Sequence, residues 1–340
     1  MYRLKDGRFE QLGMSWLKHG FTALQQDLCC DCIDSGTGAA LGVGCSDPYG
    51  SFLNGQQGGL GPRYQVDAHT GGFSYPFDLG SGSGTLFKRI QVANSDLDPA
   101  QNPGAAYYGE GHYIAPDDAA AGNGNNNASW RRMMVGGLSG GGYNMSFSGV
   151  TEREEPAILA WPADDPGASV VNAQVPNEGL FLVGYHATDN GDGTWHYEYA
   201  VHNLNSDRSG GSFSIPAAPG VAVTNIGFHD VDYHSGEPFD DTDWVGVRTM
   251  NDVRWSTLDF ATDPDANALR WGTLYNFRFD ADAAPVMTTA TLGLFKPGFP
   301  ARMSVTVEGP TTPGIENYCV GSPNSVGSGA VMGASGTVSI

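Results

Sequence analysis

The chain has 340 residues, of which 40% are hydrophobic and 11% aromatic, so it can bury a large core and is not intrinsically disordered. Its 17 basic and 37 acidic side chains give a formal net charge of −20, and a field of that sign repels nucleic-acid phosphates and anionic lipid. No apolar run approaches the ~20 residues that span a membrane. We therefore expect no nucleic-acid partner and no membrane span.

The N-terminal region, residues 1–142, is predicted to be loop-rich with one short helix. In residues 13–28 apolar side chains recur at i, i+4 and i+8, which predicts that helix. Beyond it, runs rich in Gly, Asn and Pro interrupt the chain, and residues 86–92 are the best strand candidate.

From residue 143 the pattern changes to short alternating segments separated by turn residues. The predicted strands are 143–148, 169–175, 179–187, 195–204, 212–216, 221–228, 253–258, 274–280, 287–295 and 304–308. The run Asp-Asn-Gly-Asp-Gly at 189–193 predicts a hairpin. The fold is therefore expected to be mainly β, with an antiparallel β-sandwich or jelly-roll domain over 143–310. Residues 311–340 are expected to be the truncated start of a C-terminal β module.

In the predicted strand at 195–204, odd-numbered and even-numbered residues lie on opposite faces and differ in polarity. Tyr197 and Tyr199 share an apolar face, whereas His196 and Glu198 share a polar one. We expect His196 to form a cross-strand polar pair rather than a metal site.

Four cysteines, Cys29, Cys30, Cys32 and Cys45, lie within 17 residues, and Cys319 stands alone. Their spacing differs from the paired C-x₂₋₄-C knuckles of a zinc site, which favours a disulfide over thiolate zinc or free thiols. Cys45 is expected to bridge to one of the other three, and the partner is left open.

The densest group of titratable side chains lies in residues 228–244 (FHDVDYHSGEPFDDTDW). If the preceding strand continues, Asp230, Asp232 and His234 project to one face, and His229 points to the other. Two carboxylates and an imidazole form a plausible divalent-metal set. The alternative is a solvated acidic loop that leaves a strand.

Transition-metal sites usually gather imidazoles from separate elements, so His19, His112 or His229 could complete such a site. The expected ion is Ca²⁺, Zn²⁺ or Cu²⁺. No P-loop or Rossmann fingerprint is present, so no nucleotide cofactor is expected.

Five segments of the sequence carry a resemblance to known proteins: residues 2–10 (YRLKDGRFE), 15–21 (SWLKHGF), 44–49 (GCSDPY), 227–237 (GFHDVDYHSGE) and 270–277 (RWGTLYNF). Together they resemble a group of large exported proteins of planctomycete and myxobacterial type. The tail at 318–325 (YCVGSPNS) resembles the opening of a separate β-rich terminal module. The resemblance implies a β fold, an extracellular location and a fragment of a longer precursor. It carries no assigned reaction and no catalytic residue.

These observations lead to two alternatives. In the first, the chain is a secreted β protein with a His/carboxylate metal site, and as an enzyme it would act on an extracellular polymer or small substrate. In the second, it is a non-catalytic, Ca²⁺-stabilised surface, matrix or glycan-binding module. The sequence leaves open whether the protein is an enzyme.

Overall fold

The computed structural model describes residues 1–19, 23–28, 30–38, 40–48, 59–231 and 236–311, together with two short strands at 331–332 and 338–339. Strands account for 42% of the structure and helices for 7%, so the expected excess of strand is confirmed. All strand pairs in the described residues are antiparallel.

The described residues contain three five-stranded sheets. The first has the order β2 (Arg8–Gln11), β1 (Tyr2–Lys5), β5 (Ala106–His112), β6 (Ala128–Ser139) and β7 (Gly142–Glu152). The second has the order β12 (Val223–His229), β15 (Leu274–Ala281), β10 (Trp195–Asn203), β9 (Leu180–Asp189) and β8 (Ser169–Gln174). The third has the order β13 (Val245–Arg248), β14 (Asp252–Ser256), β11 (Gly210–Pro216), β16 (Val286–Leu294) and β17 (Arg302–Gly309).

Two small sheets and several short helices complete the described elements. The small sheets pair β3 (Leu17–Lys18) with β4 (Leu60–Gly61) and β18 (Val331–Met332) with β19 (Val338–Ser339). The helices are α1 (Asn94–Leu97), α2 (Pro116–Ala120), α3 (Ala160–Asp164) and the 3₁₀ turns η3 (Arg63–Gln65) and η4 (Ala157–Leu159).

The second and third sheets pack face to face and form the predicted sandwich. Tyr199 and Phe277 from the second sheet meet Phe213 and Trp255 from the third, and all four are fully buried. Burying a large apolar side chain stabilises a fold by roughly 1.5–3 kcal/mol, so this aromatic layer stabilises the packing of the two sheets. The tyrosine face of the 195–204 strand is therefore the core face, as expected.

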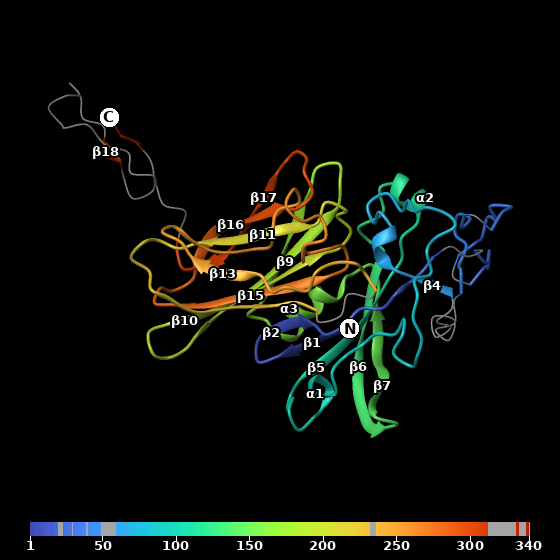
Figure 1. Ribbon diagram of the computed structural model, residues 1–340, viewed down its shortest axis with the longest axis horizontal. Coiled ribbons are helices and arrows are strands. Elements are labelled where there is room, and N and C mark those ends of the chain that lie inside the picture. The colour runs from blue at the N-terminus through green and yellow to red at the C-terminus, as the bar shows by residue number, and fades with distance from the viewer. Residues whose placement is uncertain are drawn as a thin grey trace.

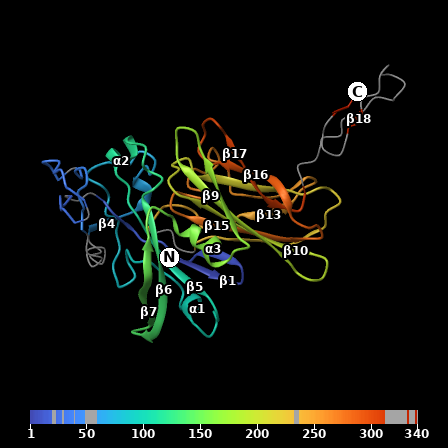
Figure 2. The same ribbon diagram turned by 180° about the vertical axis from the view of Figure 1, so that it is seen from behind.

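The opposite face of the second sheet is covered by the N-terminal hairpin and by α3. Phe9 from β2 and Trp161 from α3 pack against Ala200 and Leu274, and this second cluster is also fully buried. Figures 1 and 2 show the hairpin β1–β2 lying beside the sandwich, with the other N-terminal segments gathered on one side of it. The molecule thus has three layers where the hairpin covers the sandwich.

All ten strands predicted after residue 142 are present, with ends that shift by a few residues. The hairpin predicted at 189–193 joins β9 to β10, which pair from Asp189 and Trp195 onward. The hairpin of β6 and β7 crosses residues 142–143, so the first sheet continues as far as Glu152. The division of the chain into domains at this point stays a prediction.

The helix predicted over residues 13–28 is wrong. Leu17 and Lys18 form β3, which pairs antiparallel with Leu60 and Gly61. The apolar residues of this segment do not share a buried face, because Leu24 and Leu28 are exposed. Backbone pairing with a distant segment overrides a weak local helix preference here. The strand candidate at 86–92 is also wrong, since no strand lies there.

Candidate functional site

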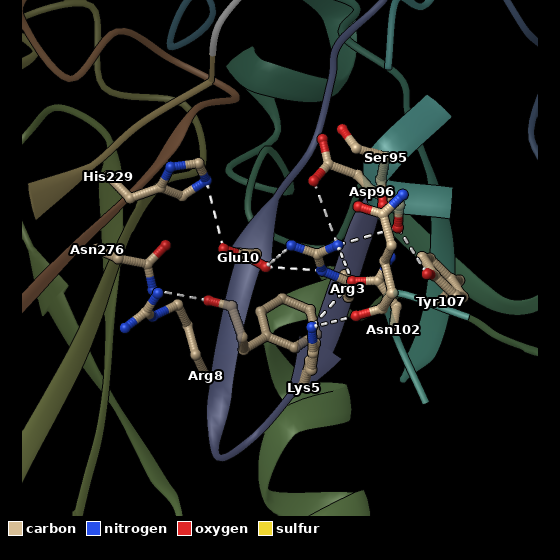
Figure 3. A network of polar contacts seen from close by, with 12 residues as sticks. Arg3, Lys5, Arg8, Glu10, Ser95, Asp96, Asn102, Tyr107, His229 and Asn276 are labelled. Atoms are coloured by element: carbon tan, nitrogen blue, oxygen red, sulfur yellow. Dashed lines mark hydrogen bonds and ion pairs between the residues drawn. The ribbon is translucent and has the colours of Figure 1, made fainter. Parts of the chain in front are cut away.

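The structure places the predicted metal ligand His229 in a contact with the N-terminal hairpin. His229 ends β12, and its Nε2 lies 3.4 Å from Oε2 of Glu10 on β2. Figure 3 shows the imidazole pointing toward Glu10, whose other carboxylate oxygen accepts a 2.7 Å hydrogen bond from Nε of Arg3. His229 therefore links the sandwich to the hairpin.

Behind Glu10, a polar network ties the hairpin to the segment around α1. Nη1 of Arg3 donates to the backbone carbonyl of Asp96 at 2.9 Å and to Oδ1 of Asn102 at 2.8 Å. Lys5 donates to the same Asn102 oxygen at 3.1 Å (Figure 3). Each buried charge in this network has a partner, and this pairing offsets the free energy that is lost when a charge is removed from water. The network holds the fold together.

Asp230 follows His229 and is buried, with Oδ2 accepting a 2.6 Å hydrogen bond from Nδ2 of Asn267. Asp232 and His234 lie outside the described residues. The metal site predicted at 229–234 therefore stays a prediction.

The two histidines proposed to complete the site have separate surroundings. The ring of His19 stacks on Phe77 at 4.5 Å, and its Nδ1 lies 3.2 Å from the carbonyl of Leu17. His112 packs edge-on to Trp271 at 6.2 Å, and burial lowers its pKa to about 4. Within the described ranges, no group of three His, Cys, Asp or Glu side chains is placed to hold a metal ion.

The cysteine cluster contains the expected disulfide, which joins Cys32 to Cys45. Cys30 is exposed, whereas Cys29 and Cys319 lie outside the described residues. The pairing resolves the choice that the spacing left open.

A cleft of about 610 Å³ is lined by N-terminal segments and by Gly236, which lies between β12 and β13. Its lining includes three aromatic side chains, one carboxylate and one serine hydroxyl: Trp16, Tyr64, Phe87, Asp78 and Ser81. We call it the Trp16 cleft. Its volume falls in the range of small-molecule sites, and its mixture of aromatic walls and a few polar groups is typical of them.

The elements around the cleft are joined by specific contacts. Tyr64 belongs to η3, and the next residue, Gln65, pairs its side-chain amide with both backbone groups of Asp78, at 3.0 and 2.9 Å. The Asp78 carboxylate in turn accepts the N–H of Gly80 at 2.8 Å. Asp78 and Tyr64 are thereby held on neighbouring walls.

Trp16 forms the floor of the cleft and is only 6% exposed. The backbones of Gly80 and Gly236 flank its indole, and a Cβ on Gly236 would lie 2.1 Å from Cζ2 of Trp16. Both glycines also have positive φ, of 66° and 72°, which other residues adopt only with strain. Glycine is therefore required at both positions.

The electrostatics of the cleft discriminate among ligand classes. Nζ of Lys88 lies 5.2 Å from the ring centroids of both Trp16 and Phe87, and burial lowers the pKa of this lysine. These rings already have a cation beside them, so a second cation would be repelled by Lys88. An anionic polymer would meet Asp78 and the overall charge of −20. A neutral, hydroxyl-rich ligand meets neither obstacle.

Sequence reasoning did not find this cleft. It placed Trp16 on a helix and did not single out Tyr64, Asp78 or Phe87. One feature of the sequence could have indicated the cleft, namely the number of aromatic residues in the polar, Gly-rich stretch 59–90. Aromatic residues in loops that lack strand periodicity are candidates for ligand contacts.

No protein-family model, curated protein or solved structure matches this chain. In the described part of the chain, no helix is both long enough and apolar enough to cross a membrane. The function must therefore be argued from the geometry of the Trp16 cleft.

Proposed function

We propose that this protein is an exported β-sandwich protein that binds a neutral carbohydrate polymer in the Trp16 cleft. Of the two alternatives drawn from the sequence, this is the glycan-binding one. The observation that carries it is the lining of the cleft, where the rings of Tyr64 and Phe87 stand beside Asp78 and Ser81. The disulfide between Cys32 and Cys45 supports export, since such bonds persist in oxidising compartments.

The chemistry of a sugar ring fits this lining. A pyranose has an apolar face of C–H groups, which packs on an aromatic ring, and a rim of hydroxyls, which need hydrogen-bond partners. Tyr64 is 43% exposed and offers a ring to that face. The Asp78 carboxylate accepts hydrogen bonds, and the Ser81 hydroxyl both donates and accepts them.

The test is isothermal titration calorimetry with soluble neutral polysaccharides: a β-glucan, a mannan, a galactan and a xylan. We expect at least one to bind, and Tyr64→Ala to weaken that binding at least tenfold because the stacking surface is lost. Tyr75→Ala is the matched control, since Tyr75 is 82% exposed and does not line the cleft. It should leave the affinity unchanged.

Absence of binding to every member of the panel at millimolar concentration would contradict the proposal. So would a Tyr64→Ala variant that binds as tightly as the wild type. Asp78→Asn keeps the shape of the side chain and removes its charge. It should weaken binding less than Tyr64→Ala does, because an amide oxygen still accepts a hydrogen bond.

A further inference from the structure

A second, much smaller hollow adjoins the Trp16 cleft, and Tyr64 lines both. Its volume is about 30 Å³, and its walls include Val66, Phe239 and Arg270. We call it the Arg270 hollow. A space of this size holds about two groups the size of a water molecule, so it can take a hydroxyl or hydroxymethyl group and cannot take a sugar ring.

The Arg270 guanidinium is held rigidly in the wall of this hollow. Its Cζ lies 3.8 Å from the ring centroid of Phe239 and 4.7 Å from that of Phe295. Nη2 donates to the backbone carbonyls of Pro264 and Ala266 at 2.9 and 3.0 Å. The residue is only 6% exposed, yet its Nε has no hydrogen-bond partner in the described part of the chain.

A buried N–H donor without an acceptor costs free energy, and an oxygen atom placed in the hollow would remove that cost. Because Tyr64 lines both spaces, a sugar unit stacked on it in the cleft would have the hollow beside it. Its ring occupies the larger space, so only an exocyclic substituent can reach the smaller one. In a hexose, the hydroxymethyl group on C5 is such a substituent, and a pentose such as xylose lacks it.

We infer that the Arg270 hollow accepts the hydroxymethyl group of the sugar unit at Tyr64 and makes the protein selective for hexose over pentose polymers. This inference rests on the proposed function and names its substrate class. Four charged side chains line the hollow in two opposite-sign sets: Asp207 and Lys296 pair with each other at 2.8 Å, and Arg270 lies in the field of the Glu237 carboxylate.

The experiment compares cellohexaose with xylohexaose, because the two chains share the same backbone linkage and differ only in the hydroxymethyl groups. Calorimetry on the wild-type protein should give at least fivefold tighter binding of cellohexaose. Val66→Ile adds one methyl group to the wall of the hollow. It should reduce cellohexaose affinity to the level of xylohexaose and leave xylohexaose affinity unchanged.

Val171→Ile on β8 is the matched control, because Val171 packs against the sandwich core and does not line the hollow. It should retain the wild-type preference. If Val66→Ile fails to fold, as judged by its melting temperature, the wild-type comparison alone decides the question.

The outcomes separate the two proposals. Equal affinities of the wild type for both hexasaccharides would overturn the inference and leave the proposed function standing. A preference for cellohexaose that persists in folded Val66→Ile would also overturn it. If neither hexasaccharide binds, the inference fails, and the proposed function then depends on the remaining members of the polysaccharide panel.

Discussion

His196 on β10 lies directly opposite Asp280 on β15, and Nδ1 of its ring is 2.6 Å from Oδ1 of that carboxylate. The other ring nitrogen lies 3.3 Å from Oε2 of Glu198 on the same strand. One imidazole thus bridges two carboxylates on the polar face of the second sheet. The cross-strand pair expected from the alternation of this strand is confirmed.

We predict that His196 stabilises the protein more in mild acid than in mild alkali. The hydrogen bond to Glu198, opposed by burial and aided by Asp280, raises the pKa of His196 above its ordinary 6.5. A raised folded-state pKa means that the stabilisation is complete below about pH 6.5 and is lost as the pH rises through the folded value. In urea unfolding, the free energy of unfolding of His196→Gln should therefore lie further below that of the wild type at pH 5.5 than at pH 8.5.

The control for this prediction is His69→Gln, because His69 forms no ion pair with a carboxylate of the described residues. A deficit for His196→Gln that is the same at both pH values would contradict the raised pKa.

Arg8 and Glu198 form a two-bond ion pair between the hairpin and the sandwich. Nε and Nη2 of Arg8 donate to the two carboxylate oxygens of buried Glu198 at 3.0 and 3.2 Å. Arg8→Met should cost about 3 kcal/mol, because it leaves a buried charge without its main partner. The double variant Arg8→Met with Glu198→Gln should cost less than the sum of the single changes. Additive losses in this double-mutant cycle would show that the pair is not coupled.

We predict that His202 makes the protein less stable in acid. It is fully buried, and burial, together with the nearby charge of Arg63, lowers its pKa to about 3. His202 becomes protonated near pH 6.5 in the unfolded chain and stays neutral in the folded chain. The free energy of unfolding therefore falls as the pH drops from 6.5 toward 3. Between pH 8 and pH 5, the free energy of unfolding of the wild type should fall by about 2 kcal/mol more than that of His202→Leu. Parallel stability curves over this range would contradict the lowered pKa.

The disulfide between Cys32 and Cys45 closes a loop with a sequence separation of 13. In the chain-entropy model such a bridge contributes about 3 kcal/mol. The variant Cys32→Ser with Cys45→Ser should exchange backbone amides faster in residues 23–48 and little faster in the sandwich, since neither cysteine belongs to a sandwich strand. Hydrogen exchange with mass spectrometry measures both regions at once. Equal acceleration everywhere would mean that the bridge stabilises the whole fold.

The metal site proposed at His229–His234 can be tested by melting temperature. After treatment with a chelator, addition of Ca²⁺, Zn²⁺ or Cu²⁺ should raise the melting temperature, because an ion that binds only the folded state stabilises it by about 2.7 kcal/mol at a hundredfold excess over Kd. Asp232→Asn with His234→Ala should abolish the rise and leave the apo protein unchanged. Wild-type protein that shows no rise with any of the three ions would identify the segment as an ordinary acidic loop.

Ten strands from residue 143 onward could be predicted because their evidence is local, whereas β13 was not predicted. Alternation of side chains in 195–204 places Tyr197 in the core and Glu198 on the other face, whatever the neighbouring strands are. The hairpin at 189–193 is likewise determined by its own residues. The short strands β1 and β2 were not predicted, because four residues each give too little periodicity to distinguish them from loop.

The sequence by itself therefore determined the class of fold, the strands of the sandwich other than β13, and the choice of a disulfide for the clustered cysteines. Only the tertiary structure decided that residues 17–18 form a strand, that His229 contacts Glu10, and that Cys32 is the partner of Cys45. It alone also brought Trp16, Tyr64, Asp78 and Gly236 to one cleft. These residues are separated by up to 220 positions, and contacts over such distances depend on how whole sheets pack, which no local pattern of side chains encodes.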